Sequence, residues 1–183
     1  MTRMSVRRPR VDITLKYEAH GHADKRLIVL HQTISPDAKG LSDVQGVGHY
    51  LDTVGYGIHI ITDVDGNSAA VTPSEERAIY WHVEGANEES IGIEQVSYKT
   101  GDPKYWWKRM KQLHKAARWI AYLAKEHGIP ITYDPNAQHG VCGHADVTKA
   151  KGIQGGHTDC QYPNYPTKWV VRQAQLYRRT GWA

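Results

Sequence analysis

The sequence contains no phenylalanine, only two cysteines and no long hydrophobic run. Two cysteines are too few for the disulfide framework that holds many small secreted domains together. A membrane-spanning helix needs about 20 consecutive apolar residues, whereas the longest apolar stretches here, such as residues 27–30, have the length of one core strand. These absences predict a chain that does not insert into a membrane and that folds around a core of its own.

The sequence also shows no secretory signal, and its composition is ordinary for a globular protein. Residues 1–10 are basic, but no apolar segment follows them, so we expect no signal peptide. Of the 183 residues, 40% are hydrophobic and 23% are charged, which excludes a fibrous or mostly disordered chain. The net charge of +4 suits an anionic partner such as nucleic acid, a membrane surface or a cell wall, but it does not choose among them.

The apolar pattern predicts an arm followed by one domain. Residues 1–22 are rich in charge and are interrupted by proline and glycine, which indicates a loose arm ahead of a domain over residues 23–183. Short apolar runs predict strands at 27–30, 57–62, 69–72 and 91–96. Apolar spacings and end signals predict helices over 42–53, 103–126 and 167–179. We therefore expect the α/β class, a single domain with a central mixed β-sheet flanked by helices.

Residues 134–166 are rich in glycine, proline, aspartate, asparagine and histidine, which predicts a long irregular segment. Loops of that length are uncommon unless they carry function. The segment contains His144 and, further on, the run His157-Thr158-Asp159-Cys160. His31 joins these candidates because it ends a predicted buried strand, and ligands collect beyond the carboxyl ends of such strands.

These residue types indicate a metal site, although each has a simpler reading. Histidine, aspartate and cysteine all bind zinc, and a catalytic zinc typically has three protein ligands and a water. His31 could instead be a core histidine with satisfied hydrogen bonds, and loop histidines often lie on the surface. The third ligand stays open between Asp159 and Cys160, because both residue types bind zinc. Cys160 could instead pair with Cys142 in a disulfide, which would remove it from the metal.

Glu94 is the candidate for acid–base chemistry. Side chains alternate along the predicted strand, so Glu94 shares a face with Gly92 and Val96. A carboxylate on such a face lies either at the solvent edge or in a functional pocket. Partial desolvation would raise the pKa of this carboxyl, which suits a general base acting on a metal-bound water.

Four stretches carry a resemblance to a known family. They are Val29-Leu30-His31-Gln32-Thr33, residues 56–66, Trp81-His82 with Asn87 and residues 90–94, and Gly143-His144-Ala145-Asp146 with residues 157–159. Together they resemble the zinc-dependent N-acetylmuramoyl-L-alanine amidases of the amidase-2 family, which includes phage endolysins and peptidoglycan recognition proteins. The likeness extends over residues 27–166, which is most of the chain.

The resemblance implies a role for each matching residue. The Zn²⁺ ligands would be His31, His144 and Asp159. Glu94 would be the catalytic base, and His157 would stabilise the oxyanion from the position of a family lysine. His59, His82 and Asn87 would bind substrate, with His59 and His82 at positions where the family has histidines of its substrate cleft or nearby core. The chain departs from the family at Cys160, where proline is usual, and at Ile58, where some phage members have a catalytic tyrosine.

The function implied by this resemblance is cleavage of the amide bond between N-acetylmuramic acid and L-alanine in bacterial peptidoglycan. Residues 23–183 would be the amidase catalytic domain of a phage endolysin, held in the host cytoplasm until lysis and then acting on the cell wall. We expect a monomer that binds peptidoglycan, with no nucleic-acid partner and no membrane insertion.

Two other functions compete with this one. A peptidoglycan-binding recognition module of the same fold would lack catalysis, and such modules tend to lose a zinc ligand that this chain keeps. A zinc-containing nucleic-acid-binding protein would need lysine and arginine clustered on one element, whereas here they are mostly dispersed.

Overall fold

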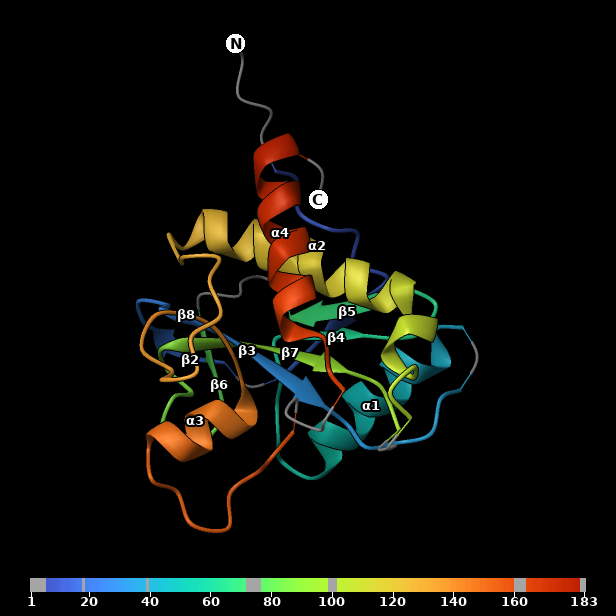
Figure 1. The fold of residues 1–183 in the computed structure, drawn as a ribbon. Helices are drawn as coiled ribbons and strands as arrows, with labels where there is room; N and C mark the ends of the chain where they lie inside the picture. The colour runs from blue at the N-terminus through green and yellow to red at the C-terminus, as the bar shows by residue number, and fades with distance from the viewer. Residues whose placement is uncertain are drawn as a thin grey trace.

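A computed structural model describes residues 6–17, 19–38, 40–71, 77–98, 102–159 and 164–181. Its centre is a six-stranded sheet (Figure 1). In spatial order the strands are β1 (Ile13–Leu15), β5 (Ser68–Val71), β4 (Ile60–Thr62), β7 (Ser90–Gln95), β3 (Leu27–Gln32) and β8 (Gly140–Gly143). Within this sheet, as far as the structure describes it, β4 and β5 pair antiparallel and the other neighbouring strands pair parallel. The predicted central mixed sheet is confirmed.

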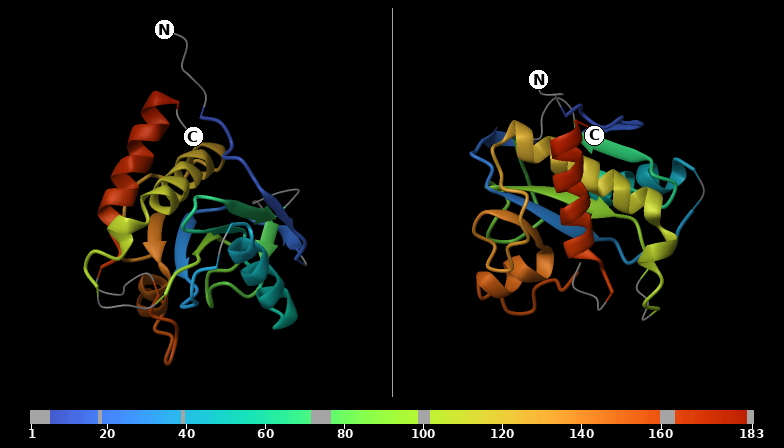
Figure 2. Two further views of the ribbon diagram at one scale, coloured as in Figure 1. Left: turned by 90° about the vertical axis from the view of Figure 1, so that its right-hand side faces the viewer. Right: turned by 45° about the horizontal axis from the view of Figure 1, so that its top comes forward.

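Helices cover both faces of this sheet (Figure 2). On one face, α2 (Met110–Glu126) and α4 (Thr167–Thr180) pack over the sheet in the largest apolar cluster. On the other face lie α1 (Ser42–Thr53) and α3 (His144–Ala150), each over its own smaller cluster. The remaining elements are η1 (Trp106–Lys108) and a separate antiparallel pair, β2 (Ala19–His22) with β6 (Arg77–Ile79). None of the helices in the described ranges combines the length and the apolar character needed to cross a membrane.

The alternation of β3 and β7 decides which face can carry a site. Ile28 and Leu30 of β3, and Ile91 and Ile93 of β7, are buried in the cluster under α2 and α4. The residues between them point to the other face, where α1 and α3 each cover a separate apolar cluster. His31 of β3 and Glu94 of β7 lie on that face.

The predicted loose arm is wrong for the part of residues 1–22 that the structure describes. β1 pairs with β5 along the edge of the main sheet, and the Ser68 amide donates to Asp12 Oδ2 over 2.9 Å. Val6 is buried in the core beneath α2. Without β1, the outer edge of β5 would expose unpaired backbone N–H and C=O groups. The three residues of β1 pair with Ala69–Val71 of that strand. A strand that short leaves little periodicity to read in the sequence.

Two further boundaries differ from the prediction. Residues 134–166 are not irregular throughout, because they contain β8 and α3. The helix predicted to begin at residue 103 begins at Met110, after a turn and the short helix η1. The Asp102 carboxylate accepts the Lys104 amide over 2.8 Å, and Arg109 leaves the helical region at φ −113°, ψ 36°. Local side-chain bonding therefore competes with the helix at its start.

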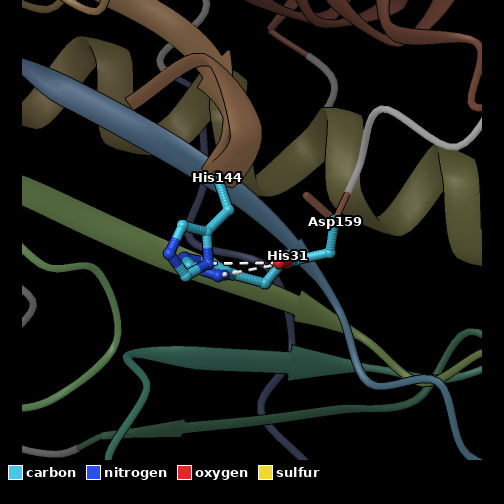
Figure 3. A group of neighbouring side chains, drawn as sticks. All are labelled: His31, His144 and Asp159. Atoms are coloured by element: carbon cyan, nitrogen blue, oxygen red, sulfur yellow. Dashed lines mark ion pairs between the residues drawn. The ribbon is translucent and has the colours of Figure 1, made fainter. Parts of the chain in front are cut away.

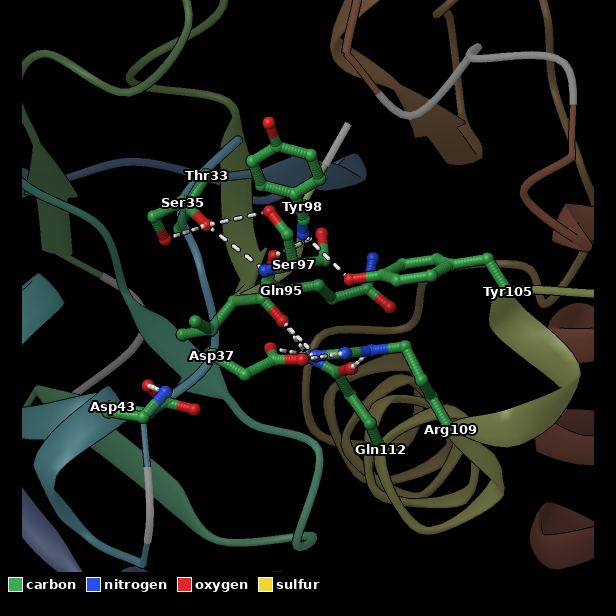
Figure 4. A network of polar contacts seen from close by, with 12 residues as sticks. Thr33, Ser35, Asp37, Asp43, Gln95, Ser97, Tyr98, Tyr105, Arg109 and Gln112 are labelled. Atoms are coloured by element: carbon green, nitrogen blue, oxygen red, sulfur yellow. Dashed lines mark hydrogen bonds and ion pairs between the residues drawn. The ribbon is translucent and has the colours of Figure 1, made fainter. Parts of the chain in front are cut away.

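Arg109, at the start of α2, is buried and belongs to a polar network that connects α2 to the sheet (Figure 4). Its guanidinium donates to both oxygens of Asp37, over 2.6 and 2.7 Å, and its Nε donates to Gln112 Oε1 over 2.7 Å. The Gln112 amide in turn donates to the carbonyls of Thr62 and Val96, over 2.8 and 2.9 Å. The protein itself satisfies this charge.

Candidate metal centre

The sheet register brings the first candidate residues together. His31 and Glu94 are direct partners on the parallel strands β3 and β7. β8 pairs with β3 up to Gly143, so His144, the first residue of α3, follows at the same end of the sheet. The chain returns after α3, where the Ala145 amide donates to the Asp159 carbonyl over 3.3 Å. Four segments thus converge at the carboxyl ends of adjacent parallel strands.

His31, His144 and Asp159 face one another in this place (Figure 3). His31 Nδ1 lies 3.5 Å from Asp159 Oδ2, and His144 Nδ1 lies 3.2 Å from Asp159 Oδ1. One possible ligand atom from each residue lies within 4.8 Å of the others. The Gln32 amide donates to Asp159 Oδ2 over 3.1 Å and so fixes the carboxylate. The predicted convergence of the three side chains is confirmed.

The donor set fits a zinc ion. Two imidazole nitrogens and one carboxylate oxygen are a known ligand set of catalytic zinc, which keeps another position for water. All three side chains are buried, yet Asp159 Oδ1 receives no hydrogen bond. Leaving a buried carboxylate oxygen unpaired is costly. A divalent cation between the three groups would remove this penalty.

The protonation states also suit a cation. Burial by itself would raise the pKa of the Asp159 carboxyl, but the neighbouring rings of His144 and His31 outweigh it and hold that pKa below its ordinary value. Burial lowers the pKa of His31, against the opposing effect of Asp159. Metal ligands must be a deprotonated carboxylate and a neutral imidazole, and these are the states that the surroundings favour.

Glu94 is buried and does not lie at the solvent edge. It is 9% exposed, and its Oε1 has no hydrogen-bond partner. Burial raises the pKa of this carboxyl well above its ordinary value, and the charge of Asp159 adds to the effect. Of the two readings that the sequence left open, the solvent edge is wrong because Glu94 is buried. A raised pKa would suit proton transfer near neutral pH.

His157 occupies the rim of the centre. Its side chain is 74% exposed and its Nδ1 lies 3.8 Å from Asp159 Oδ1. The ring stacks on that of His144, with centroids 4.8 Å apart and planes 5° from parallel. A donor at this position can reach a ligand that approaches from solvent.

The three residues expected to bind substrate, His59, His82 and Asn87, are all buried. His59 is fully buried, and its Nδ1 accepts the Gly92 amide over 3.1 Å while its Nε2 contacts the Arg77 carbonyl over 3.0 Å. Asn87 Oδ1 accepts the amides of His82 and Val83, both over 3.0 Å. His82 and Asn87 are each 6% exposed. The expected substrate contact is a correction for His59, because its polar atoms are occupied and no surface remains.

The cysteines settle one alternative. Cys142 is a free thiol buried beside α3, and burial raises its pKa. The expected alternative of a disulfide from Cys142 is therefore wrong, because its side chain lies in the apolar cluster with Leu27 and Val29. Cys160 lies outside the described residues.

Sequence reasoning missed the hydrogen-bonding partners that hold the ligands. Examples are the Gln32 amide on Asp159 and Ser90, whose hydroxyl lies 3.2 Å from His82 Nε2. The only signal for Ser90 was its place in the Ser-Ile-Gly-Ile-Glu stretch, which does not reveal a partner eight residues away. A backbone donor such as Gln32 N leaves no signal in a sequence.

Comparisons with known proteins agree with this fold. The family model for N-acetylmuramoyl-L-alanine amidases, Amidase_2, matches residues 21–163. No curated protein matches the chain by sequence.

Several solved structures share the fold. One is the endolysin amidase LysCS of Clostridium intestinale, with a TM-score of 0.64, 18% identity, and coverage of 94% of this chain and 98% of that one. Another is the hydrolase AmiA of Staphylococcus aureus, with a TM-score of 0.67, 14% identity, and coverage of 96% and 89%. The Apis mellifera protein PGRP-SA has a TM-score of 0.53, 15% identity, and coverage of 94% and 93%.

Proposed function

Because the chain belongs to the N-acetylmuramoyl-L-alanine amidase family, we propose that it cleaves peptidoglycan with a zinc ion held by His31, His144 and Asp159. The bond cut is the amide between N-acetylmuramic acid and L-alanine. The observation that carries the zinc proposal is the meeting of these three buried side chains within 4.8 Å. Asp159 Oδ1, which is buried and has no hydrogen bond, supports it further.

The chain's own groups supply the proton transfers. When bound, zinc would supply a water of lowered pKa and a positive charge near the scissile carbonyl. Glu94 takes the proton of the attacking water as the oxygen–carbon bond forms. Glu94 then returns that proton to the alanine nitrogen as the carbon–nitrogen bond breaks. The raised pKa of this buried carboxyl makes it able to hold the proton between the two steps.

His157 acts on the carbonyl oxygen. An amide carbonyl is a poor electrophile, so its oxygen needs a hydrogen-bond donor or a positive charge as negative charge develops. His157 is exposed and stacked on His144 at the rim, which lets its ring nitrogen meet a substrate that enters from solvent. Asp159, His144 and His31 keep their positions by hydrogen bonds and packing while the proton moves.

The catalytic unit is a monomer in this proposal, because all three ligands and Glu94 belong to one chain. It comprises residues 23–183 together with β1, which completes the edge of the sheet. Similarity to endolysin amidases supports a role in lysis of a bacterial host, where the protein would wait in the host cytoplasm and then act on the cell wall.

The proposal is tested by metal analysis together with an assay of amines released from purified cell wall. We expect about one zinc per chain, loss of amine release after chelation and recovery when Zn²⁺ returns. His144→Ala should lose both zinc and activity, whereas His49→Ala, on an exposed position of α1, should keep both. Full activity in the metal-free protein would refute the proposal, and binding to cell wall without amine release would identify a recognition module instead.

A further inference from the structure

A buried chain of hydrogen bonds leads away from the ligand His31. His31 Nε2 lies 3.2 Å from His82 Nδ1, and His82 Nε2 lies 3.2 Å from Ser90 Oγ. The Ser90 hydroxyl donates to the Ala86 carbonyl over 2.6 Å. All four residues are less than 9% exposed. The chain thus begins on the side of the His31 ring that faces away from Asp159 and ends on a backbone acceptor.

The last acceptor sets the direction of every bond in the chain. A carbonyl oxygen cannot donate, so the single proton of the Ser90 hydroxyl belongs to the bond with Ala86. Ser90 Oγ must then accept from His82 Nε2. A neutral His82 ring that donates from Nε2 has its lone pair on Nδ1, and this nitrogen lies 3.2 Å from His31 Nε2. The proton between the two rings therefore sits on His31 Nε2.

We propose that His82, anchored by Ser90, is a positioning residue that holds His31 in the Nε2–H tautomer and so presents the Nδ1 lone pair to the metal. The inference rests on the proposed zinc site and adds to it the device that prepares one ligand. A ligating histidine commonly donates its other N–H to a carboxylate, a carbonyl or water. Here a second imidazole is the acceptor.

The device opposes a local preference for the wrong tautomer. Asp159 Oδ2 lies 3.5 Å from His31 Nδ1, and a carboxylate there attracts a proton to that nitrogen. A proton on Nδ1 would block the ligand position. It would also leave His31 Nε2 and His82 Nδ1 as two lone pairs facing each other in a buried place. The neighbouring imidazole thus makes the blocked tautomer unfavourable.

The surroundings hold His82 in place for this task. Asn87 fixes the His82 backbone amide over 3.0 Å. Gly92 lies directly beneath the ring, where an added Cβ would stand 2.7 Å from His82 Nδ1 and 2.3 Å from Ile58 Cδ1. His59 meets the ring edge-on, with centroids 5.1 Å apart. Gly92 therefore provides the space that the acceptor nitrogen of His82 requires.

The first test reads the tautomer in the wild-type protein without metal. Long-range proton–nitrogen NMR correlations distinguish a protonated Nε2 from a protonated Nδ1 in each neutral histidine. We expect Nε2–H for both His31 and His82 and a mixture of His31 tautomers in Ser90→Ala. A His31 ring with its proton on Nδ1 in the wild type would overturn the inference.

The second test measures Zn²⁺ affinity by competition with a chelator. His82→Leu removes the acceptor, and we expect affinity to fall by about 10- to 100-fold. His82→Asn places an amide oxygen near the position of Nδ1, so it should recover most of that loss. A purely structural role would instead weaken both variants alike, because both lose the imidazole, and equal affinities of the two would overturn the inference.

A matched control separates the effect of the hydrogen-bond chain His31–His82–Ser90, here called the relay, from the effect of losing any buried hydrogen bond. Ser68 is also fully buried, and its hydroxyl donates to the Arg10 carbonyl over 2.7 Å. Ser68→Ala should leave Zn²⁺ affinity unchanged, whereas Ser90→Ala should lower it. Failure of the wild type to bind Zn²⁺ would refute the proposed function itself. Binding and hydrolysis that are indifferent to Ser90 and His82 would refute only the relay.

Discussion

Two polar clusters of this protein, each made mostly of buried side chains, differ in whether their polar atoms have hydrogen-bond partners. Arg109, Asp37 and Gln112 form a charged network in which the guanidinium and the amide donate to protein acceptors (Figure 4). At the metal centre, Asp159 Oδ1 and Glu94 Oε1 are buried without a hydrogen bond. The polar atoms of the first cluster find partners within the protein, whereas the second leaves two buried carboxyl oxygens without a hydrogen bond.

An unpaired buried atom alone is not a sign of function. Trp119 Nε1 and Asp43 Oδ2 also lack a partner, and neither belongs to the metal centre. What distinguishes the centre is that an unpaired carboxylate oxygen stands within ligand distance of two imidazoles, with a second unpaired carboxyl on the neighbouring strand. The comparison predicts that changes in one cluster affect chemistry and changes in the other affect stability.

The largest effect should come from Glu94→Gln. The amide keeps the size of the side chain but cannot accept and return a proton, so amine release should fall by about 100-fold or more. Zinc content and the free energy of unfolding should change little, because the ligands are intact. Measuring all three on one preparation tests the point, and near-normal turnover would reject Glu94 as the base.

Arg109→Met should show the opposite pattern. Removing the guanidinium leaves Asp37 and Gln112 Oε1 without this donor and takes one of two donors from the Val96 carbonyl, and we expect the free energy of unfolding to drop by about 3 kcal/mol. Zinc affinity of the folded protein should stay the same. Denaturant unfolding checks this, with Arg172→Met on the exposed side of α4 as the control. A loss of zinc affinity without a loss of stability would break the comparison.

His59 sharpens the comparison, because it lies near the centre but has both ring nitrogens occupied. Burial lowers its pKa from the ordinary 6.5 to about 3. Protonation of His59 therefore favours the unfolded chain. The contribution of the neutral His59 ring to the free energy of unfolding is fully present above pH 6.5 and is lost as pH falls toward 3.

The measurement is the free energy of unfolding between pH 6.5 and 4. In His59→Gln its slope with pH should be shallower than in the wild type by roughly 1 kcal/mol per pH unit, the effect of one proton. His49→Gln, on an exposed position, should follow the wild type. Parallel curves for His59→Gln and the wild type would contradict this role of His59.

The smallest effect should be a change in the pH–rate profile of His157→Lys. An imidazole changes charge between about pH 5 and 8, whereas a lysine ammonium does not. If His157 donates to the carbonyl oxygen, the acidic limb of amine release should differ between the two proteins. Identical acidic limbs would remove His157 from the catalytic step, and stability should be unaffected because the side chain is largely exposed.

Local patterns were sufficient for most elements of the fold. The helix at Ser42–Thr53 and the final helix from Thr167 appear where the sequence predicts them, because an apolar stripe is set by neighbours within a few residues. β1 and β8 were missed, since three or four residues carry little periodicity and their pairing is decided by strands far away in the chain.

The ligands were also predictable, but their surroundings were not. Motifs pointed to His31, His144 and Asp159, and the structure brings them together. The same motifs suggested a substrate contact for His59, which is fully buried. A motif records which residue type stands at a position, whereas exposure depends on which elements pack over it.

The sequence by itself determined the chemistry available to this protein: the buried strands, the ligand types and a carboxylate beside glycine on one face of a strand. Only the tertiary structure decided that Glu94 is buried, that Asp159 reaches His31 and that His82 lies within hydrogen-bond distance of that ring. The physical reason is that desolvation and hydrogen-bond direction depend on atoms brought close by folding, and those neighbours lie far apart along the chain.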